Sequence, residues 1–264
     1  MKISKHITFF YDEGRFKYLN QLIAEAGTYP HDVDIFIHTN KSISDDKLHL
    51  PSNNITILVY IHDLKGRDPY ILPWLCRPIM ESQKNHYDIF MYVEDDILVP
   101  RAALLYWLEH KNTVMAENYN LGFLRIEVDP MGKHYTTDNA TSPDGSIDQT
   151  LRKTITINGK VYAVNDANPY CAFWIYDANE FSRFIYSGFY NPALINGYGI
   201  REKAAIGLHG LYTPWYTYTV IPVMDKGLNP GCKIYHLPNN YLYGAWKLHP
   251  FDEVFVSCDY RRDF

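Results

Sequence analysis

Short apolar runs alternate with amphipathic or polar segments through the first hundred residues. Apolar residues recur at helical spacing over 16–26, and Gly27 follows as a helix-ending residue. Strands that are apolar along their whole length are typical of a mainly parallel sheet covered by helices on both faces. The sequence therefore predicts an α/β fold. The runs expected to form its strands are 7–11, 33–38, 55–61 and 89–93.

The rest of the chain is less regular. Pro73 and Pro78 interrupt a segment at 70–86 that we expect to be helical. Asn158-Gly159 predicts a hairpin over 154–164, and the polar stretch 131–146 is typical of a long loop. We also expect helices at 101–117 and 179–186, and strands at 121–128 and 172–176. No repeat or linker divides the chain, so we expect one domain over 1–264.

Composition excludes several classes of protein. The net charge of −5 argues against a general nucleic-acid binder. No apolar stretch reaches the length of a membrane span, and the first residues lack the apolar core of a signal peptide. The four cysteines show no metal-binding spacing. We therefore expect a cytoplasmic protein with reduced thiols, no membrane span and no nucleic-acid partner.

Aromatic residues are unusually frequent. The chain has 23 tyrosines, 13 phenylalanines and 5 tryptophans, which together make 16% of its residues. Most such rings pack in cores and rims, but aromatic faces also stack on sugar rings and bases. The excess therefore adds a carbohydrate or nucleotide to the candidate ligands.

Three consecutive acids, Glu94, Asp95 and Asp96, follow the apolar run 89–93. In a parallel sheet this position lies at the carboxyl edge, where ligands bind. Like charges this close repel by about 1 kcal/mol per pair in water and by more when partly buried. A divalent cation such as Mn²⁺ or Mg²⁺ would relieve that repulsion. The alternative is a solvated acidic turn at the end of a strand.

The segment 87–100 resembles the DxD-type motif of GT-A glycosyltransferases. A buried strand, the Glu-Asp-Asp triplet, Ile97 and then Pro100 are similar to the N-acetylglucosaminyltransferase I type. In order of elements the resemblance extends over about residues 7–130. It implies a single Rossmann-like GT-A domain, with a nucleotide-sugar half at 1–100 and an acceptor half at 101–264. It also implies metal-dependent transfer of a hexose or pentose from a nucleotide diphosphate sugar, with uridine diphosphate (UDP) expected, to a glycan or glycoconjugate hydroxyl.

The resemblance assigns roles around the motif. Asp96 would bind the metal, Asp95 would hold the ribose or share the metal, and Glu94 would face the nucleotide or donor sugar. Loop residues after the first three strands would line the donor site, although each has an ordinary capping or turn role as its alternative. These loop residues are Tyr11, Arg15, Thr39, Asn40 and Asp63.

Two further residues have open alternatives. Arg77 lies in an apolar context, where it forms either a buried ion pair or a contact to the donor diphosphate. His236 lies within an apolar strand, and many GT-A enzymes return a C-terminal histidine to the metal. The alternative for His236 is a core histidine bonded to backbone.

An inverting transfer needs a base for the acceptor hydroxyl, whereas a retaining transfer does not. Glu202, near the start of a short helix after the glycines at 197 and 199, is the first candidate. Glu127, on a strand after the acidic motif, is the second candidate and a possible acceptor ligand. Trp215 and Tyr216 follow Pro214 and are expected to contact the acceptor.

Two other functions are compatible with parts of the sequence. A nucleotidyltransferase would share phosphate chemistry, but the first strand is followed by a loop with one glycine and no P-loop signature. A non-catalytic carbohydrate-binding protein of the same fold would account for the aromatic excess, but it leaves the acids without a role.

Overall fold

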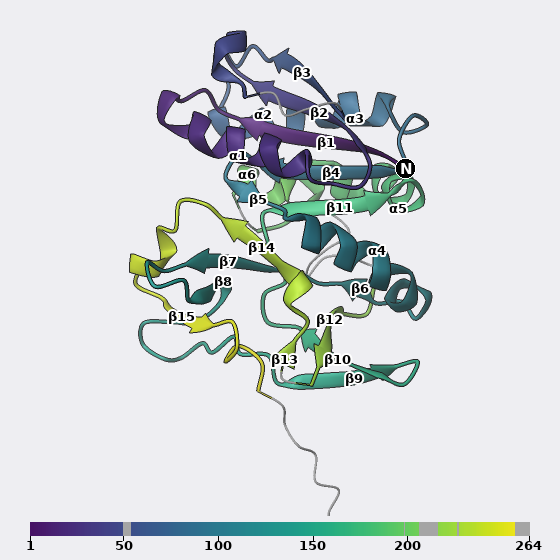
Figure 1. The fold of residues 1–264 in the computed structure, drawn as a ribbon, viewed down its shortest axis with the longest axis vertical. Coiled ribbons are helices and arrows are strands. Elements are labelled where there is room, and N and C mark those ends of the chain that lie inside the picture. The colour runs from purple at the N-terminus through teal and green to yellow at the C-terminus, as the bar shows by residue number, and fades with distance from the viewer. Residues whose placement is uncertain (50–53, 198, 206–215, 226, 257–264) are drawn as a thin grey trace, which may run out of the picture. The chain divides into compact units, whose positions relative to one another are not determined.

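The computed structural model describes residues 1–49, 54–197, 199–205, 216–225 and 227–256. The chain divides into two compact units (Figure 1). The first unit combines Met1–Arg101 with Ala172–Leu208, and the second combines Ala102–Cys171 with His209–Phe264. Both contain helices and strands, so the fold is mixed α/β. Among the described residues, no helix has the length and apolarity that crossing a membrane requires.

The first unit contains a sheet in the order β11-β4-β1-β2-β3. Its first four strands along the chain pair in parallel, and β11 joins the edge antiparallel to β4. The strands are β1 (Lys2–Phe9), β2 (Asp32–Thr39), β3 (Ile55–Ile61), β4 (Ile89–Glu94), β5 (Ile97–Leu98) and β11 (Phe173–Asp177). The helices are α1 (Phe16–Ala26), α2 (Leu72–Leu75), α3 (Arg77–Ser82), α5 (Ala178–Ile185) and α6 (Ile200–Ala204).

Helices cover both faces of this sheet, as its apolar strands predict. On one face, Lys5 of β1 reaches α1, where its Nζ donates to the Leu22 carbonyl at 3.1 Å. On the other face, Phe90 of β4 stacks on Phe181 of α5 with ring centroids 4.1 Å apart. Burial on both sides explains why these strands lack the alternation of a half-exposed sheet.

Most expected elements of this unit are confirmed, with three differences. β1 begins at Lys2 rather than at residue 7, because its polar residues are buried through hydrogen bonds that periodicity does not reveal. The expected division at residue 100 also separates β11 from the sheet that it joins, since its Phe173 aligns with Val93 of β4. The segment 70–86 forms short helices separated at its prolines instead of one continuous helix.

The second unit is built mainly from antiparallel pairs. Its first sheet has the order β13-β12-β10-β9 with β6 beside β12, and its second contains β15-β8-β7-β14. The strands are β6 (Asn120–Leu121), β7 (Leu124–Val128), β8 (His134–Thr141), β9 (Lys153–Ile157), β10 (Lys160–Asn165), β12 (Thr219–Met224), β13 (Gly227–Leu228), β14 (Lys233–His236) and β15 (Lys247–Pro250), and the helix is α4 (Arg101–Ala116).

One expectation for this unit is wrong, and a second is confirmed only in part. The stretch 131–146 contains β8 instead of forming one long loop, because its polar side chains are satisfied internally; the Thr136 hydroxyl, for example, donates to the Asn139 carbonyl at 2.6 Å. The expected strand at 121–128 is divided at Gly122. A Cβ there would lie 2.7 Å from Thr219, so β6 and β12 approach too closely for any other residue.

Three histidines form a hydrogen-bonded chain across the sheet of the first unit. His6 Nδ1 lies 2.8 Å from His38 Nε2, and His38 Nδ1 lies 2.9 Å from His62 Nε2. His6 Nε2 lies 3.0 Å from the side-chain oxygen of Gln83, Oε1, which only accepts hydrogen bonds, so the ring proton lies on Nε2. Burial lowers the pKa of His6 to about 3 and also lowers the pKa of His38 and of His62. The imidazoles of His6, His38 and His62 are therefore neutral.

These depressed pKa values predict a loss of stability in mild acid. Below about pH 6.5 the unfolded chain takes up protons that the folded chain excludes, so the free energy of unfolding falls as pH falls. Each excluded proton contributes about 1.4 kcal/mol per pH unit. We expect His6→Gln to flatten the dependence measured by urea denaturation between pH 6.5 and 5, and exposed His86→Gln to leave it unchanged. Equal slopes for wild type and His6→Gln would contradict this assignment.

Candidate functional site

A cavity of about 440 Å³ lies at the carboxyl edge of the parallel sheet in the first unit. Thr8 at the end of β1 aligns with Glu94 at the end of β4, so both side chains lie on one face of the sheet. Parallel strands place their carboxyl ends at one edge, and this brings loops distant in sequence together. The lining residues are Thr8, Phe10, Asp12, Arg15, Pro69, Tyr70, Leu72, Pro73, Glu94, Asp95, Asp96 and Arg201.

Arg15 binds two of the three predicted acids. Its Nε and Nη2 donate to the Asp95 carboxylate at 2.6 and 2.7 Å, and Nη2 also donates to Asp96 at 2.7 Å. Asp95 and Asp96 are buried, whereas the Arg15 side chain is 34% exposed. The sequence predicted that Arg15 would contact the donor. The structure places it in the site but as the counter-ion of the acids.

The cavity carries more negative than positive groups. Four carboxylates and two guanidinium groups line it, a surplus of two negative charges when all are ionised. Burial raises the pKa of Asp95 to about 6, even though the Arg15 pair acts to lower it. Burial is the main cause of this raised pKa, so Arg15 only partly offsets the cost of removing the Asp95 carboxylate from water.

Exposed aromatic rings lie at the same cavity. Phe10 is 46% exposed and Tyr70 is 57% exposed, and both line the space that the acids face. The Arg201 guanidinium lies 5.5 Å from the centre of the Tyr70 ring. None of these three residues is predicted at the site from the sequence. Phe10 was detectable from its place directly after β1, but Tyr70 and Arg201 reach the cavity only through the tertiary fold.

The other predicted donor residues lie near the sheet edge in structural roles. The Tyr11 backbone nitrogen donates to Asn40 Oδ1 at 2.8 Å, so these two loops are joined as expected. Thr39 is fully buried, and Asp63 Oδ1 accepts the Lys65 backbone nitrogen in an exposed turn. None of these four predicted residues is among the described residues that line the cavity.

Arg77 is a buried structural residue rather than a donor ligand. Its guanidinium donates to the backbone carbonyls of Phe189, Tyr190 and Ala204 at 3.0, 2.8 and 3.2 Å. It also lies 3.8 Å from the centre of the Trp74 ring. Burial lowers its pKa to about 10, so it remains charged at neutral pH. The predicted diphosphate contact is therefore not supported.

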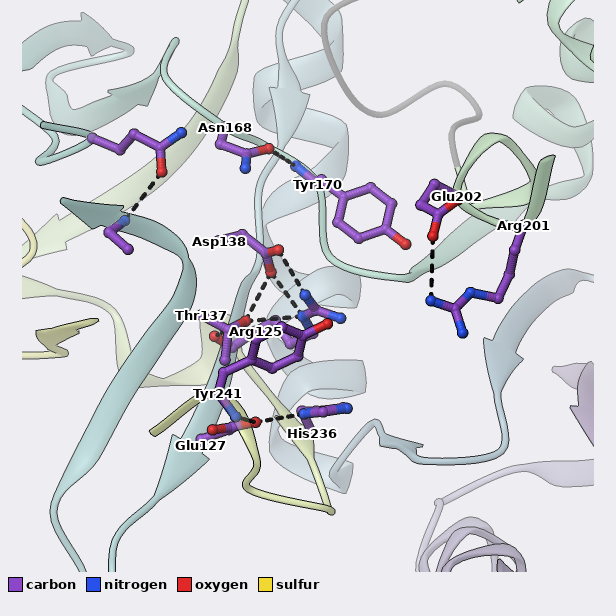
Figure 2. A network of polar contacts seen from close by, with 12 residues as sticks. Arg125, Glu127, Thr137, Asp138, Asn168, Tyr170, Arg201, Glu202, His236 and Tyr241 are labelled. Carbon is purple, nitrogen blue, oxygen red and sulfur yellow. Dashed lines mark hydrogen bonds and ion pairs between the residues drawn. The ribbon is translucent and has the colours of Figure 1, made fainter. Parts of the chain in front are cut away.

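Glu127 and His236 form a buried pair in the second unit (Figure 2). His236 Nδ1 lies 2.6 Å from Glu127 Oε1, and the Glu127 side chain is fully buried. Glu127 also accepts the backbone nitrogens of Tyr241 at 3.1 Å and Leu242 at 2.8 Å. These bonds hold β14 and the following turn against β7. Glu127 is thus placed as a structural acceptor, and not as the predicted acceptor ligand or base.

Glu202 lies on α6, as predicted, beside the cavity-lining Arg201. Its carboxylate is 37% exposed at the side chain and contacts Arg201 Nη2 at 3.2 Å (Figure 2). Of the two predicted acceptor residues, Tyr216 is half-buried in the second unit, and Trp215 lies outside the described residues.

The donor set suits a hard divalent cation. Glu94, Asp95 and Asp96 offer only oxygen atoms, the ligands that Mg²⁺ and Mn²⁺ prefer. In the part of the chain that the structure describes, no three His, Cys, Asp or Glu side chains stand in a ready-made ligand arrangement. Arg15 occupies both aspartates here, so a bound cation would share with Arg15 the task of compensating their charge.

No protein-family model matches this chain, and no curated protein matches it in sequence.

Replacing Arg15 tests its role as counter-ion. We expect Arg15→Met to lower the free energy of unfolding at pH 7 by about 1–3 kcal/mol, because two buried carboxylates lose their partner. The loss is smaller than for a fully buried pair because Arg15 is 34% exposed at the side chain. Urea denaturation checks this, with exposed Arg67→Met as the matched control. Unchanged stability of Arg15→Met would contradict the assignment.

Replacing Arg77 separates a structural role from ligand binding. We expect Arg77→Met to lower the free energy of unfolding by about 3–5 kcal/mol, since three backbone carbonyls lose a charged donor that is itself buried. Exposed Arg183→Met on α5 is the control and should change stability little. If Arg77→Met folds with normal stability but loses affinity for nucleotide, the structural assignment is wrong and the donor contact is restored.

Proposed function

We propose that this chain is a metal-dependent glycosyltransferase that uses a nucleotide diphosphate sugar, with a UDP-sugar as the expected donor and a glycan or glycoconjugate hydroxyl as acceptor. The observation that carries the proposal is the acidic triplet at the carboxyl end of a parallel strand, lining a cavity large enough for a small-molecule ligand. The similarity of this triplet to the DxD-type motif favours sugar transfer over nucleotidyl transfer.

The charge of the cavity supports a role for a cation. A diphosphate is anionic, and a cavity with a surplus of carboxylates repels it. Asp95 and Asp96 are the residues that would hold the metal, with Glu94 beside them. When bound, a Mn²⁺ or Mg²⁺ ion would supply the positive charge that stabilises the diphosphate leaving group.

The remaining groups of the cavity fit the parts of such a donor. Arg201 presents a planar guanidinium group, which matches phosphate oxygens in geometry, whereas Arg15 Nε and Nη2 are engaged with Asp95 and Asp96. The exposed faces of Phe10 and Tyr70 offer stacking surfaces for a base or a sugar ring. In an inverting reaction, Glu202 is our candidate to accept the proton of the attacking hydroxyl, because its carboxylate is accessible next to Arg201.

Thermal unfolding with nucleotide ligands tests the site. We expect UDP and UDP-sugars to raise the Tm in the presence of Mn²⁺ and not in the presence of chelator, because a ligand of the native state stabilises it by mass action. Asp96→Asn should abolish the shift. Asp32→Asn, at the exposed amino end of β2, is the matched control and should retain it.

Hydrolysis of the donor in the absence of acceptor then tests catalysis. Manganese-dependent release of UDP that is lost in Asp96→Asn supports a transferase. A thermal shift without any turnover would favour a binding protein. No shift with any nucleotide sugar, from well-folded wild-type protein, would reject the proposed donor site.

A further inference from the structure

A second cavity, of about 340 Å³, lies wholly within the second unit. Its walls come from β7, β8 and the segment that leads into β15. Among its lining residues are Arg125 and Asp138, two amide side chains at Gln149 and Asn168, and the aromatic Trp246. Its size falls within the range of about 300–1,000 Å³ that is usual for ligand pockets.

One wall is a buried ion pair. Arg125 donates through Nε and Nη2 to both oxygens of Asp138 at 2.8 and 2.7 Å, and each side chain is only 9% exposed (Figure 2). The rings of Tyr170 and Tyr241 flank the guanidinium at 5.5 and 5.2 Å. Burial acts to lower the pKa of Arg125, but the Asp138 carboxylate outweighs it and holds that pKa above its ordinary range. Both groups of the pair are therefore charged, and their opposite charges cancel.

Some donor nitrogens at this wall are not used in hydrogen bonds within the described part of the protein. Asn168 uses its side-chain oxygen to accept the Tyr170 backbone nitrogen, and Gln149 uses its oxygen to accept the Ala140 backbone nitrogen. Within the described residues, no protein acceptor is present for either amide nitrogen or for Arg125 Nη1. Buried or half-buried polar groups are normally satisfied. These three nitrogens are thus donors available to a ligand.

Aromatic rings also line this cavity. Trp246 and Tyr241 are each 42% exposed while lining it. Trp246 also lines an adjoining cavity of about 340 Å³, together with Tyr243, whose side chain is 78% exposed. Large aromatic surface left in contact with water beside a polar wall is typical of a binding site rather than of a core.

We propose that this cavity binds a neutral saccharide, with Trp246 stacking on the sugar ring and Arg125, Asn168, Gln149 and Asp138 bonding its hydroxyls. A hydroxyl both donates and accepts, so it suits a wall that offers amide and guanidinium donors next to a carboxylate. Anionic ligands are disfavoured because Arg125, the one cation among the described residues that line the cavity, is already neutralised by Asp138. The shared indole extends the site toward the adjoining cavity, which fits a disaccharide.

The saccharide site stands on the second unit alone and does not rest on the proposed glycosyltransferase activity. Its test uses the full chain and isothermal titration calorimetry with methyl glycosides and disaccharides of glucose, galactose, mannose and N-acetylglucosamine. We expect at least one to bind with a Kd of about 1 mM or below. Trp246→Ala should weaken that binding by about tenfold, because it removes the stacking surface.

Four further measurements make the result specific. Asn168→Ala gives a second variant that removes only one open donor and should weaken binding several-fold. Tyr186→Ala removes an aromatic side chain that is 78% exposed in the first unit and should leave Kd unchanged. Asp96→Asn should also leave Kd unchanged, which separates this site from the donor site. Uridine should not displace the saccharide.

Three results would overturn the proposal. These are no binding by any saccharide of the panel, an unchanged Kd in folded Trp246→Ala and Asn168→Ala, or displacement of the saccharide by uridine. Loss of nucleotide binding with retained saccharide binding would reject the proposed donor site and leave this one standing.

Discussion

The ion pair of Arg15 with Asp95 and Asp96 sets the properties of the sheet edge in the first unit. A single guanidinium joins the loop after β1 to the turn after β4 and contacts both buried aspartates. Because one positive charge faces two carboxylates, with Glu94 and Asp12 in the same cavity, compensation is incomplete. The pKa of Asp95 is raised mainly by burial, and repulsion from the Asp96 carboxylate adds to the rise. The same deficit that would destabilise a purely structural site gives a cation a reason to bind.

Buried cationic side chains recur through the first unit where other segments of the chain supply backbone acceptors. Lys5 is fully buried, with its ammonium group on the Leu22 carbonyl, and burial lowers its pKa to about 7. Arg77 similarly donates hydrogen bonds from one guanidinium group to three backbone carbonyls. Such groups cost little while every bond is made and much when one is removed, so they specify how the segments between strands are placed.

The two cavities have different charge and therefore different expected ligands. The cavity of the first unit has excess carboxylate and suits an anion only together with a cation. The cavity of the second unit has a neutralised ion pair and exposed indole, which suits a hydroxyl-rich neutral molecule. In each case the ligand class follows from which charges are left over after the protein has paired its own groups.

Local sequence pattern was sufficient to predict the parallel strands, helix α1, the β9–β10 hairpin and the acidic turn after β4. Each of these has its signal in residues adjacent in sequence: apolar periodicity, Gly27, Asn158-Gly159 and the acidic triplet itself. The strand β8 escaped prediction because its polar residues are satisfied by near neighbours and by partners distant in the chain; the Thr136 hydroxyl, for example, lies within hydrogen-bond distance of the Asn139 and His249 carbonyls. Arg15 was predicted at the site, but only the fold decided that it binds Asp95 and Asp96 rather than remaining open. Arg77, Glu127 and His236 illustrate the same limit: their chemistry is visible in the sequence, but whether a charged group meets a ligand or a backbone carbonyl depends on which segments pack against it. Sequence determined the elements and the reactive groups, and tertiary structure decided their partners, because hydrogen bonds and ion pairs are formed between segments that periodicity cannot relate.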